Sequence, residues 1–171
     1  AILKTARLGY DGKGQVGVGS AGEARAAWTA FRQVPCVLER RLTLELELSV
    51  VLARGQDGAM AAFPAGENRH VNGILDTTVV PARVIPPLAG LARELAEGVA
   101  TAWGYVGVMG VELFVADGGR LFVNEVAPRP HNSGHYTRDA CGVDQFEQQV
   151  RSLCGLPLGR PDLLRPAAMA N

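Results

Sequence analysis

Two glutamates, Glu112 and Glu125, are spaced so that they can face one another across a β-hairpin. Segments rich in Val, Leu and Phe predict two strands, over residues 105–116 and 120–126. Between them lies Asp117-Gly118-Gly119-Arg120, and a Gly-Gly pair suits a two-residue turn because both central positions tolerate positive φ. With that turn Asp117 faces Arg120. Counting back along the strands, Phe114 then faces Val123 and Glu112 faces Glu125.

Opposed carboxylates on neighbouring strands point to a bound cation. Their Cβ atoms would be roughly 4.5–5.5 Å apart, and like charges at that separation repel. Magnesium prefers oxygen ligands and is often held by one or two carboxylates together with substrate phosphates. The spacing therefore predicts a magnesium site at Glu112 and Glu125. The alternative is a solvated strand face, because a slip of one residue would separate the pair.

The run LKTARLGYDGKGQ, residues 3–15, holds both lysines of the chain, Lys4 and Lys13. Its glycines would let backbone N–H groups approach a phosphate closely, which favours a nucleotide-binding loop. The run has neither the spacing of a Walker A motif nor that of a dinucleotide fingerprint, so a plain turn is the alternative. Arginine supplies every other basic side chain, which indicates that Lys4 and Lys13 serve as compact point charges.

The composition limits the classes of partner and location. The chain has 171 residues, enough for one domain or two small lobes, and its formal net charge is zero. No basic stripe is visible, so nucleic acid and membrane surfaces are excluded as expected partners. We see no apolar run of membrane-spanning length and no signal peptide. The three cysteines lack metal-type spacing, which favours reduced thiols and a cytoplasmic location.

Hydrophobic periodicity predicts an α+β fold with strands paired through hairpins and helices on one side of the sheet. The expected helices cover residues 21–33, 88–103, 134–141 and 143–154. Besides the hairpin, the expected strands cover residues 1–4, 16–18, 36–39, 45–53, 59–63 and 75–80. We expect a small Gly-rich lobe over residues 1–40, a larger lobe with the metal hairpin over 41–155, and a tail over 156–171 that is a strap or partly disordered.

Four segments resemble a known family. They are LKTARLGYDGKGQ at residues 3–15, CVLER at 36–40, ELSVVLARGQDG at 47–58 and NEVAPRPHNSGHYT at 124–137. The chain resembles the ATP-grasp enzymes and, within them, the N5-carboxyaminoimidazole ribonucleotide synthetases of purine biosynthesis. The resemblance implies an ATP-grasp fold with two α+β lobes and antiparallel sheets. It also implies a fragment without the N- and C-terminal domains of the parent, which we expect to be inactive alone.

The resemblance implies roles for residues that contact the nucleotide and the metal. Lys4 would bind the ATP phosphates, and Glu39 with the following backbone at Arg40 would read the adenine. Glu47 would bind the ribose hydroxyls. Glu112 and Glu125 match the magnesium carboxylates, the pair that the hairpin spacing also predicts. Without the resemblance, Glu47 would be an exposed acid on a strand.

The resemblance further implies the chemistry: ATP-dependent carboxylation of 5-aminoimidazole ribonucleotide with bicarbonate, through carboxyphosphate, in a homodimeric enzyme. Arg129 and His131 would be the catalytic residues, because a guanidinium fork suits a planar anion and a histidine titrates near neutrality. The substrate-binding residues would be Tyr10, Asp11, Lys13, Asn132 and Ser133. Alone, Asn132 and Ser133 would simply cap the following helix.

Two other functions stay open at this stage. One is a different ATP-grasp ligase, such as the formate-dependent glycinamide ribonucleotide transformylase, against which the run His131-Asn132-Ser133-Gly134-His135 argues. The other is a non-catalytic module that binds nucleotide or associates with itself.

Overall fold

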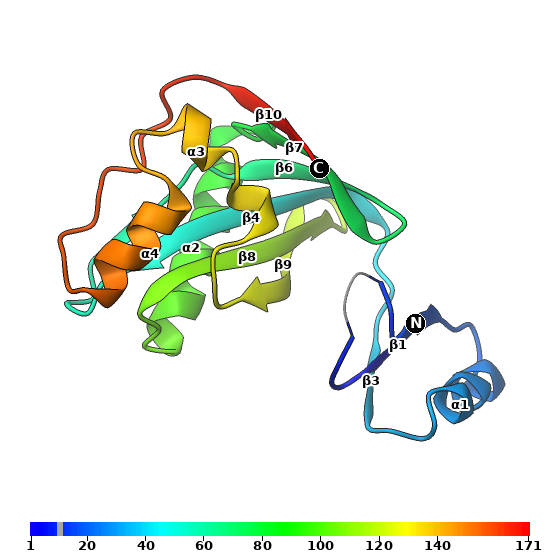
Figure 1. Ribbon diagram of the computed structural model, residues 1–171. Coiled ribbons are helices and arrows are strands. Elements are labelled where there is room, and N and C mark those ends of the chain that lie inside the picture. Colours follow the sequence, from blue (N-terminus) through cyan, green and yellow to red (C-terminus); the bar gives the residue numbers. More distant parts are fainter. Residues whose placement is uncertain (10–11) are drawn as a thin grey trace. The chain divides into compact units, whose positions relative to one another are not determined.

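The computed structural model describes residues 1–9 and 12–171 and divides into two compact units (Figure 1). The first unit comprises Ala1–Thr43 together with Val71–Ile74, and the second comprises Leu44–His70 and Leu75–Asn171. Residues 71–74 thus belong to the first unit, whereas the sequence predicted a boundary near residue 40 and one larger lobe after it.

The first unit is a three-stranded antiparallel sheet with one helix. Its strand order is β2-β1-β3, and its elements are β1 (Ile2–Thr5), β2 (Gln15–Gly17), β3 (Cys36–Glu39) and α1 (Ala21–Ala30). The helix begins after Ser20, whose hydroxyl accepts the Glu23 N–H, while the Glu23 carboxylate accepts the Gly19 N–H. It ends earlier than predicted because Arg32 and Gln33 have φ values of 56° and 57°, which no helix accommodates.

The second unit is built on a seven-stranded sheet in the order β10-β7-β6-β4-β8-β9, with β5 paired to β4. The strands are β4 (Leu44–Arg54), β5 (Met60–Ala62), β6 (Gly66–Val71), β7 (Ile74–Val80), β8 (Gly107–Ala116), β9 (Arg120–Ala127) and β10 (Ala167–Ala170). The pairings whose register is described are antiparallel. The tail was expected to be a strap or partly disordered. Instead, it contributes the edge strand β10.

Helices cover both faces of this sheet, so the prediction of helices on one side is wrong. Helix α2 (Pro86–Ala102) lies behind the sheet in Figure 1, and α3 (Thr137–Ala140) and α4 (Gln145–Leu153) lie in front. The reason is visible in β4. Leu48, Val50 and Leu52 pack toward α2, while Val51 and Ala53 pack into a second core with Tyr136 and Ala140 of the α3 region. A continuous apolar run is typical of a strand buried on two faces.

Strand β6 was not predicted, because its sequence, GENRHV, has few β-forming residues. The turn that follows it was nevertheless visible. Asn72 and Gly73 both have positive φ, 53° and 78°, and Asn-Gly is the strongest short hairpin signal in a sequence. The α+β class with two antiparallel lobes is confirmed. In the described part of the chain, no helix is long and apolar enough to span a membrane.

Candidate functional site

Glu112 of β8 and Glu125 of β9 are directly opposed, as the spacing predicted. The turn that joins their strands is not the predicted one. Ala116 rather than Asp117 pairs with Arg120, so the loop has three residues. All three, residues 117–119, have positive φ. The Glu45 carboxylate holds this loop by accepting the Gly118 N–H at 2.7 Å.

A β-bulge restores the register that the longer loop shifts. Phe114 pairs with Phe122, not with the predicted Val123, and the irregularity falls between Leu113 and Glu112. A bulge places two residues of one strand opposite one residue of its partner. Here Asn124 is the extra residue, and its side chain hydrogen-bonds to Glu112. The prediction of the opposed pair is thus confirmed, although the turn and the intermediate pairing were wrong.

Glu112 lies in a setting that a divalent cation would suit. Its side chain is 15% exposed. Burial raises the pKa of Glu112, and the nearby carboxylates of Glu125 and Glu47 raise it further. Within residues 1–9 and 12–171, no group of three or more His, Cys, Asp or Glu side chains is arranged to hold a metal. Two carboxylates are nonetheless what Mg²⁺ uses when phosphates complete its shell, so the residues fit that ion.

His70 joins this cluster, and the sequence analysis missed it. It lies on the unpredicted β6, two residues after Asn68, which pairs with Glu47 of β4. Its Nδ1 is 2.5 Å from Glu47 Oε2, and its Nε2 is 4.0 Å from Glu112 Oε1. The hydrogen bond to Glu47 raises the pKa of His70, although burial opposes this. The Asn-Gly turn could have revealed the strand, and with it a histidine on the same face as Glu47.

His131 approaches the same glutamate from the loop after β9. Its Nε2 is 3.6 Å from Glu112 Oε1, and its side chain is 10% exposed. Burial, reinforced by the charge of Arg129, lowers the pKa of His131 to about 4, so the ring is neutral at pH 7. From the sequence we expected a histidine that titrates near neutrality. Gly110 makes room for the ring, because a Cβ there would lie 2.6 Å from the Cβ of His131.

The run from His131 to Ser133 forms a short turn of its own. Ser133 Oγ is 2.9 Å from His131 Nδ1, and the Ser133 N–H donates to the same nitrogen at 3.4 Å. His131 therefore caps the 3₁₀ turn Asn132–Gly134, instead of Asn132 and Ser133 capping a helix. The amide of Asn132 donates to Asn171 Oδ1 at 3.1 Å. Arg129 is exposed, and its Nη1 donates to the carbonyl of Pro130 at 2.9 Å.

The first unit brings Lys4 and Glu39 together. Lys4 Nζ lies 2.6 Å from Glu39 Oε2, and the pair is diagonal because Lys4 of β1 pairs with Val37, two residues before Glu39. Arg40, directly after β3, is exposed. Lys13 is exposed too, in a turn between Gly12 and Gly14, which both have φ near 73°. Tyr10 and Asp11, predicted to bind substrate, lie outside the described residues.

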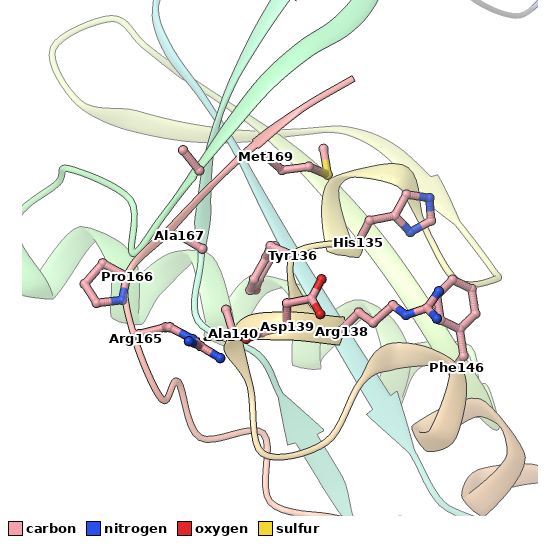
Figure 2. A pocket seen from close by; sticks show the side chains of 11 residues that line it. His135, Tyr136, Arg138, Asp139, Ala140, Phe146, Arg165, Pro166, Ala167 and Met169 are labelled. Atoms are coloured by element: carbon pink, nitrogen blue, oxygen red, sulfur yellow. Dashed lines mark hydrogen bonds between the residues drawn. The ribbon is translucent and has the colours of Figure 1, made fainter.

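A pocket of about 680 Å³ lies in the second unit (Figure 2). Its walls come from α3 and the residues just before it, the start of α4, and β10 with the segment that leads into it, and they include Arg138, Arg165 and Met169. His135 and Phe146 stack at its edge with ring centroids 5.7 Å apart. No predicted site residue is among its described lining residues, so the pocket and the carboxylate cluster are separate features.

Comparisons with known proteins agree on one family. A family model described as the ATP-grasp domain matches residues 1–146. The N5-carboxyaminoimidazole ribonucleotide synthase of Bacillus subtilis is 46% identical over 171 residues, which are 100% of this chain and 45% of that protein. The chain thus spans less than half the length of this curated relative.

Solved structures give the same picture. A crystal structure of an N5-carboxyaminoimidazole ribonucleotide synthetase with ADP matches at a TM-score of 0.92 and 44% identity, over 99% of this chain and 45% of that one. An Aspergillus clavatus N5-carboxyaminoimidazole synthase with ADP and 5-aminoimidazole ribonucleotide matches at a TM-score of 0.89 and 28% identity, with the same coverage of both chains. The expected ATP-grasp fold is therefore confirmed.

Proposed function

Because this chain belongs to the ATP-grasp family, we propose that it is the ATP- and metal-binding part of a carboxylating ligase. The enzyme would use ATP and bicarbonate to convert 5-aminoimidazole ribonucleotide to N5-carboxyaminoimidazole ribonucleotide in purine biosynthesis. The observation that carries the proposal is the opposed pair Glu112 and Glu125 with His131 3.6 Å from Glu112. The cytoplasmic location and the homodimer inferred from the sequence belong to the same proposal.

The nucleotide contacts are proposed separately for each unit. In the first unit, Lys4 would donate to the ATP phosphates, while Glu39 and the backbone at Arg40 would read the adenine. In the second, Glu47 would accept hydrogen bonds from the ribose hydroxyls. Its hydrogen bond with His70 leaves it this capacity, because a carboxylate has about four lone-pair sites. His70 would then fix the orientation of Glu47.

The phosphoryl chemistry is proposed for the β8–β9 hairpin and the loop after it. Glu112 and Glu125 would hold Mg²⁺, which offsets charge on a transferring phosphoryl group. Arg129 would bind the planar bicarbonate or carboxyphosphate through its guanidinium fork. His131, neutral at pH 7, would orient the substrate amine rather than donate a proton to it. Substrate contacts are proposed for Tyr10, Asp11, Lys13, Asn132 and Ser133.

The test is substrate-dependent ATP cleavage by the intact protein. With Mg²⁺, ATP, 5-aminoimidazole ribonucleotide and ¹³C-bicarbonate, we expect ADP release that requires all four components and a carbamate carbon in the ¹³C spectrum. Omission of bicarbonate should abolish both signals. ADP release with glycinamide ribonucleotide and formate instead would identify the other ligase. Nucleotide binding without any turnover would identify a non-catalytic module.

A further inference from the structure

Gln145, the first residue of α4, is completely buried and its amide is fully engaged with one loop. Its Oε1 accepts the backbone N–H of His131 at 2.8 Å, and its Nε2 donates to the carbonyl of His131 at 2.8 Å. The same Nε2 lies 3.0 Å from Nδ1 of His135. A primary amide has two donor hydrogens and one acceptor oxygen, so these three contacts use each group.

The surrounding residues are shaped to admit this side chain. A Cβ at Gly134 would lie 2.6 Å from Gln145 Oε1, so only glycine leaves room for the amide at that position. The backbone N–H of Gln145 donates to Thr137 Oγ1 at 3.1 Å, and Thr137 Oγ1 donates to the carbonyl of Gly134 at 2.7 Å. Helix α4 is thereby tied to both ends of the turn from His131 to His135.

The loop that Gln145 binds carries His131, the histidine that lies next to Glu112 of the proposed metal site. The backbone N–H and C=O of His131 both hydrogen-bond to Gln145. In its ring, Nδ1 lies next to Ser133, and Nε2 is 3.6 Å from Glu112. We propose that Gln145 is a positioning residue that sets the place of the His131 ring relative to Glu112. The proposal rests on the function proposed above, because the consequence for turnover requires His131 to act in that reaction.

The chain supplies a matched control in the same helix. Gln148 is also completely buried, and its amide also makes two hydrogen bonds to one backbone residue: it donates to the Gly159 carbonyl at 2.8 Å and accepts the Gly159 N–H at 2.9 Å. Gly159 lies in the segment before β10, away from the loop of His131. Gln145→Met and Gln148→Met therefore remove the same chemistry from the same helix, and only the first releases His131.

The experiment compares these two variants in the intact protein. Both should lower the melting temperature by similar amounts. We expect Gln145→Met to lower kcat about 10- to 100-fold with the KM for ATP within about twofold, as misplacement of a reacting group does. Gln148→Met should keep kcat within about twofold. In a His131→Ala background, Gln145→Met should cost little more, because residues that act through one another are not additive.

A second measurement separates the positioning role from the proposed function. Amide hydrogen exchange over residues 131–135 should accelerate in Gln145→Met and not in Gln148→Met. Equal exchange in both variants, equal loss of kcat, or a full additional loss in the His131→Ala background would overturn the positioning role. If the wild-type protein shows no turnover of the proposed substrates, the proposed function fails, and the exchange measurement decides the role of Gln145 by itself.

Discussion

The two units place their charged side chains in different surroundings. In the first unit Lys4 and Glu39 form an ion pair with 28% and 44% of their side chains exposed. In the second, Glu112 and His131 are 15% and 10% exposed. Among the described residues of the first unit, Leu3 and Val18 are the buried apolar ones, whereas the sheet of the second unit is buried on both faces.

This difference decides what each group of charges can do. Water screens an exposed pair, which contributes about 0–1 kcal/mol to stability and remains available to exchange partners. Burial disfavours the charged forms: it raises the pKa of Glu112 and lowers that of His131 to about 4. The second unit therefore holds a largely buried carboxylate beside a neutral histidine, while the Lys4–Glu39 pair of the first unit is more open to solvent.

The largest effect should come from the opposed carboxylates of Glu112 and Glu125. Glu112→Gln or Glu125→Gln should lower magnesium-dependent ATP turnover of the intact protein about 100- to 1000-fold, because under the proposed function each would remove a ligand of the ion that offsets developing charge. A raised pKa in an acid means that the fold disfavours its ionised form. Glu112→Gln should therefore not lower the melting temperature at pH 7 without Mg²⁺.

Activity assays with a magnesium titration and calorimetric melting measure both effects. Glu147→Gln, on the exposed face of α4, is the control and should leave turnover unchanged. An equal loss of turnover in the control, or a large fall in melting temperature for Glu112→Gln, would remove the contrast between the units.

The next effect concerns the loop beside these carboxylates. Arg129→Ala and His131→Ala should each lower carboxylation about 100-fold and leave ATP affinity nearly unchanged, because under the proposed function both residues would act on the substrate side of the transferring phosphoryl group. Steady-state kinetics and isothermal titration with ATP separate the two quantities. Weakened ATP binding with normal turnover at saturation would place these residues in the nucleotide site instead.

A smaller effect is expected in the first unit. Lys4→Ala should raise the Kd for ATP about tenfold, or about 1.4 kcal/mol, and leave adenosine binding unchanged, because the phosphates are the only part of ATP that its ammonium group would contact. Titration calorimetry with both ligands tests this, and Arg25→Ala in α1 removes a positive charge elsewhere in the unit as the control. Equal losses for ATP and adenosine would mean that Lys4 is structural.

The smallest effects are expected on stability, from the loss of one ion pair in each unit. Glu67 of β6 accepts the backbone N–H of Arg83 at 3.1 Å and its Nε at 2.9 Å. Glu67→Gln should lower the free energy of unfolding at pH 7 by about 1 kcal/mol. Glu39→Gln should lower it by less than about 0.5 kcal/mol, since the Glu39 side chain is 44% exposed and that of Glu67 is 16% exposed.

The pH dependence of this last pair has a defined sign. The hydrogen bonds from Arg83 lower the pKa of Glu67 below its ordinary value of 4.5. Its contribution is therefore present above that value and is lost as the pH falls through the folded-state pKa. Urea unfolding over a series of pH values from 7 downward should show the difference between wild type and Glu67→Gln shrinking as the pH falls. A difference that stays constant to the lowest pH at which the protein is still folded would mean that packing, not charge, is responsible.

The hairpin that carries Glu112 and Glu125 was predictable because strand pairing follows local rules. The apolar runs and the Gly-Gly turn placed Glu112 opposite Glu125. The three-residue loop and the bulge at Asn124 were not predictable, because both depend on contacts from elsewhere, such as Glu45 on the Gly118 N–H. The predicted pairing of Glu112 with Glu125 is nevertheless correct, because the loop and the bulge shift the register in opposite directions.

Elements with weak local signals were the ones missed. Strand β6 has a polar sequence, so hydrophobic periodicity did not predict it. Its residue His70 was therefore not predicted as part of the site. Its place in the sheet comes from pairing with β4 on one side and β7 on the other. The helices on the second face were predicted as helices, but their place on the sheet follows from Val51 and Ala53, whose burial only the packing reveals.

The sequence by itself determined the family, the α+β class and the opposed glutamates, because motifs and strand alternation are properties of neighbouring residues. Only the tertiary structure decided the charge state of His131, the contact between Glu47 and His70, and the hydrogen bonds from Gln145 to the loop of His131. Each depends on desolvation or on hydrogen bonds between residues at least 14 positions apart in the chain, and no local pattern encodes them.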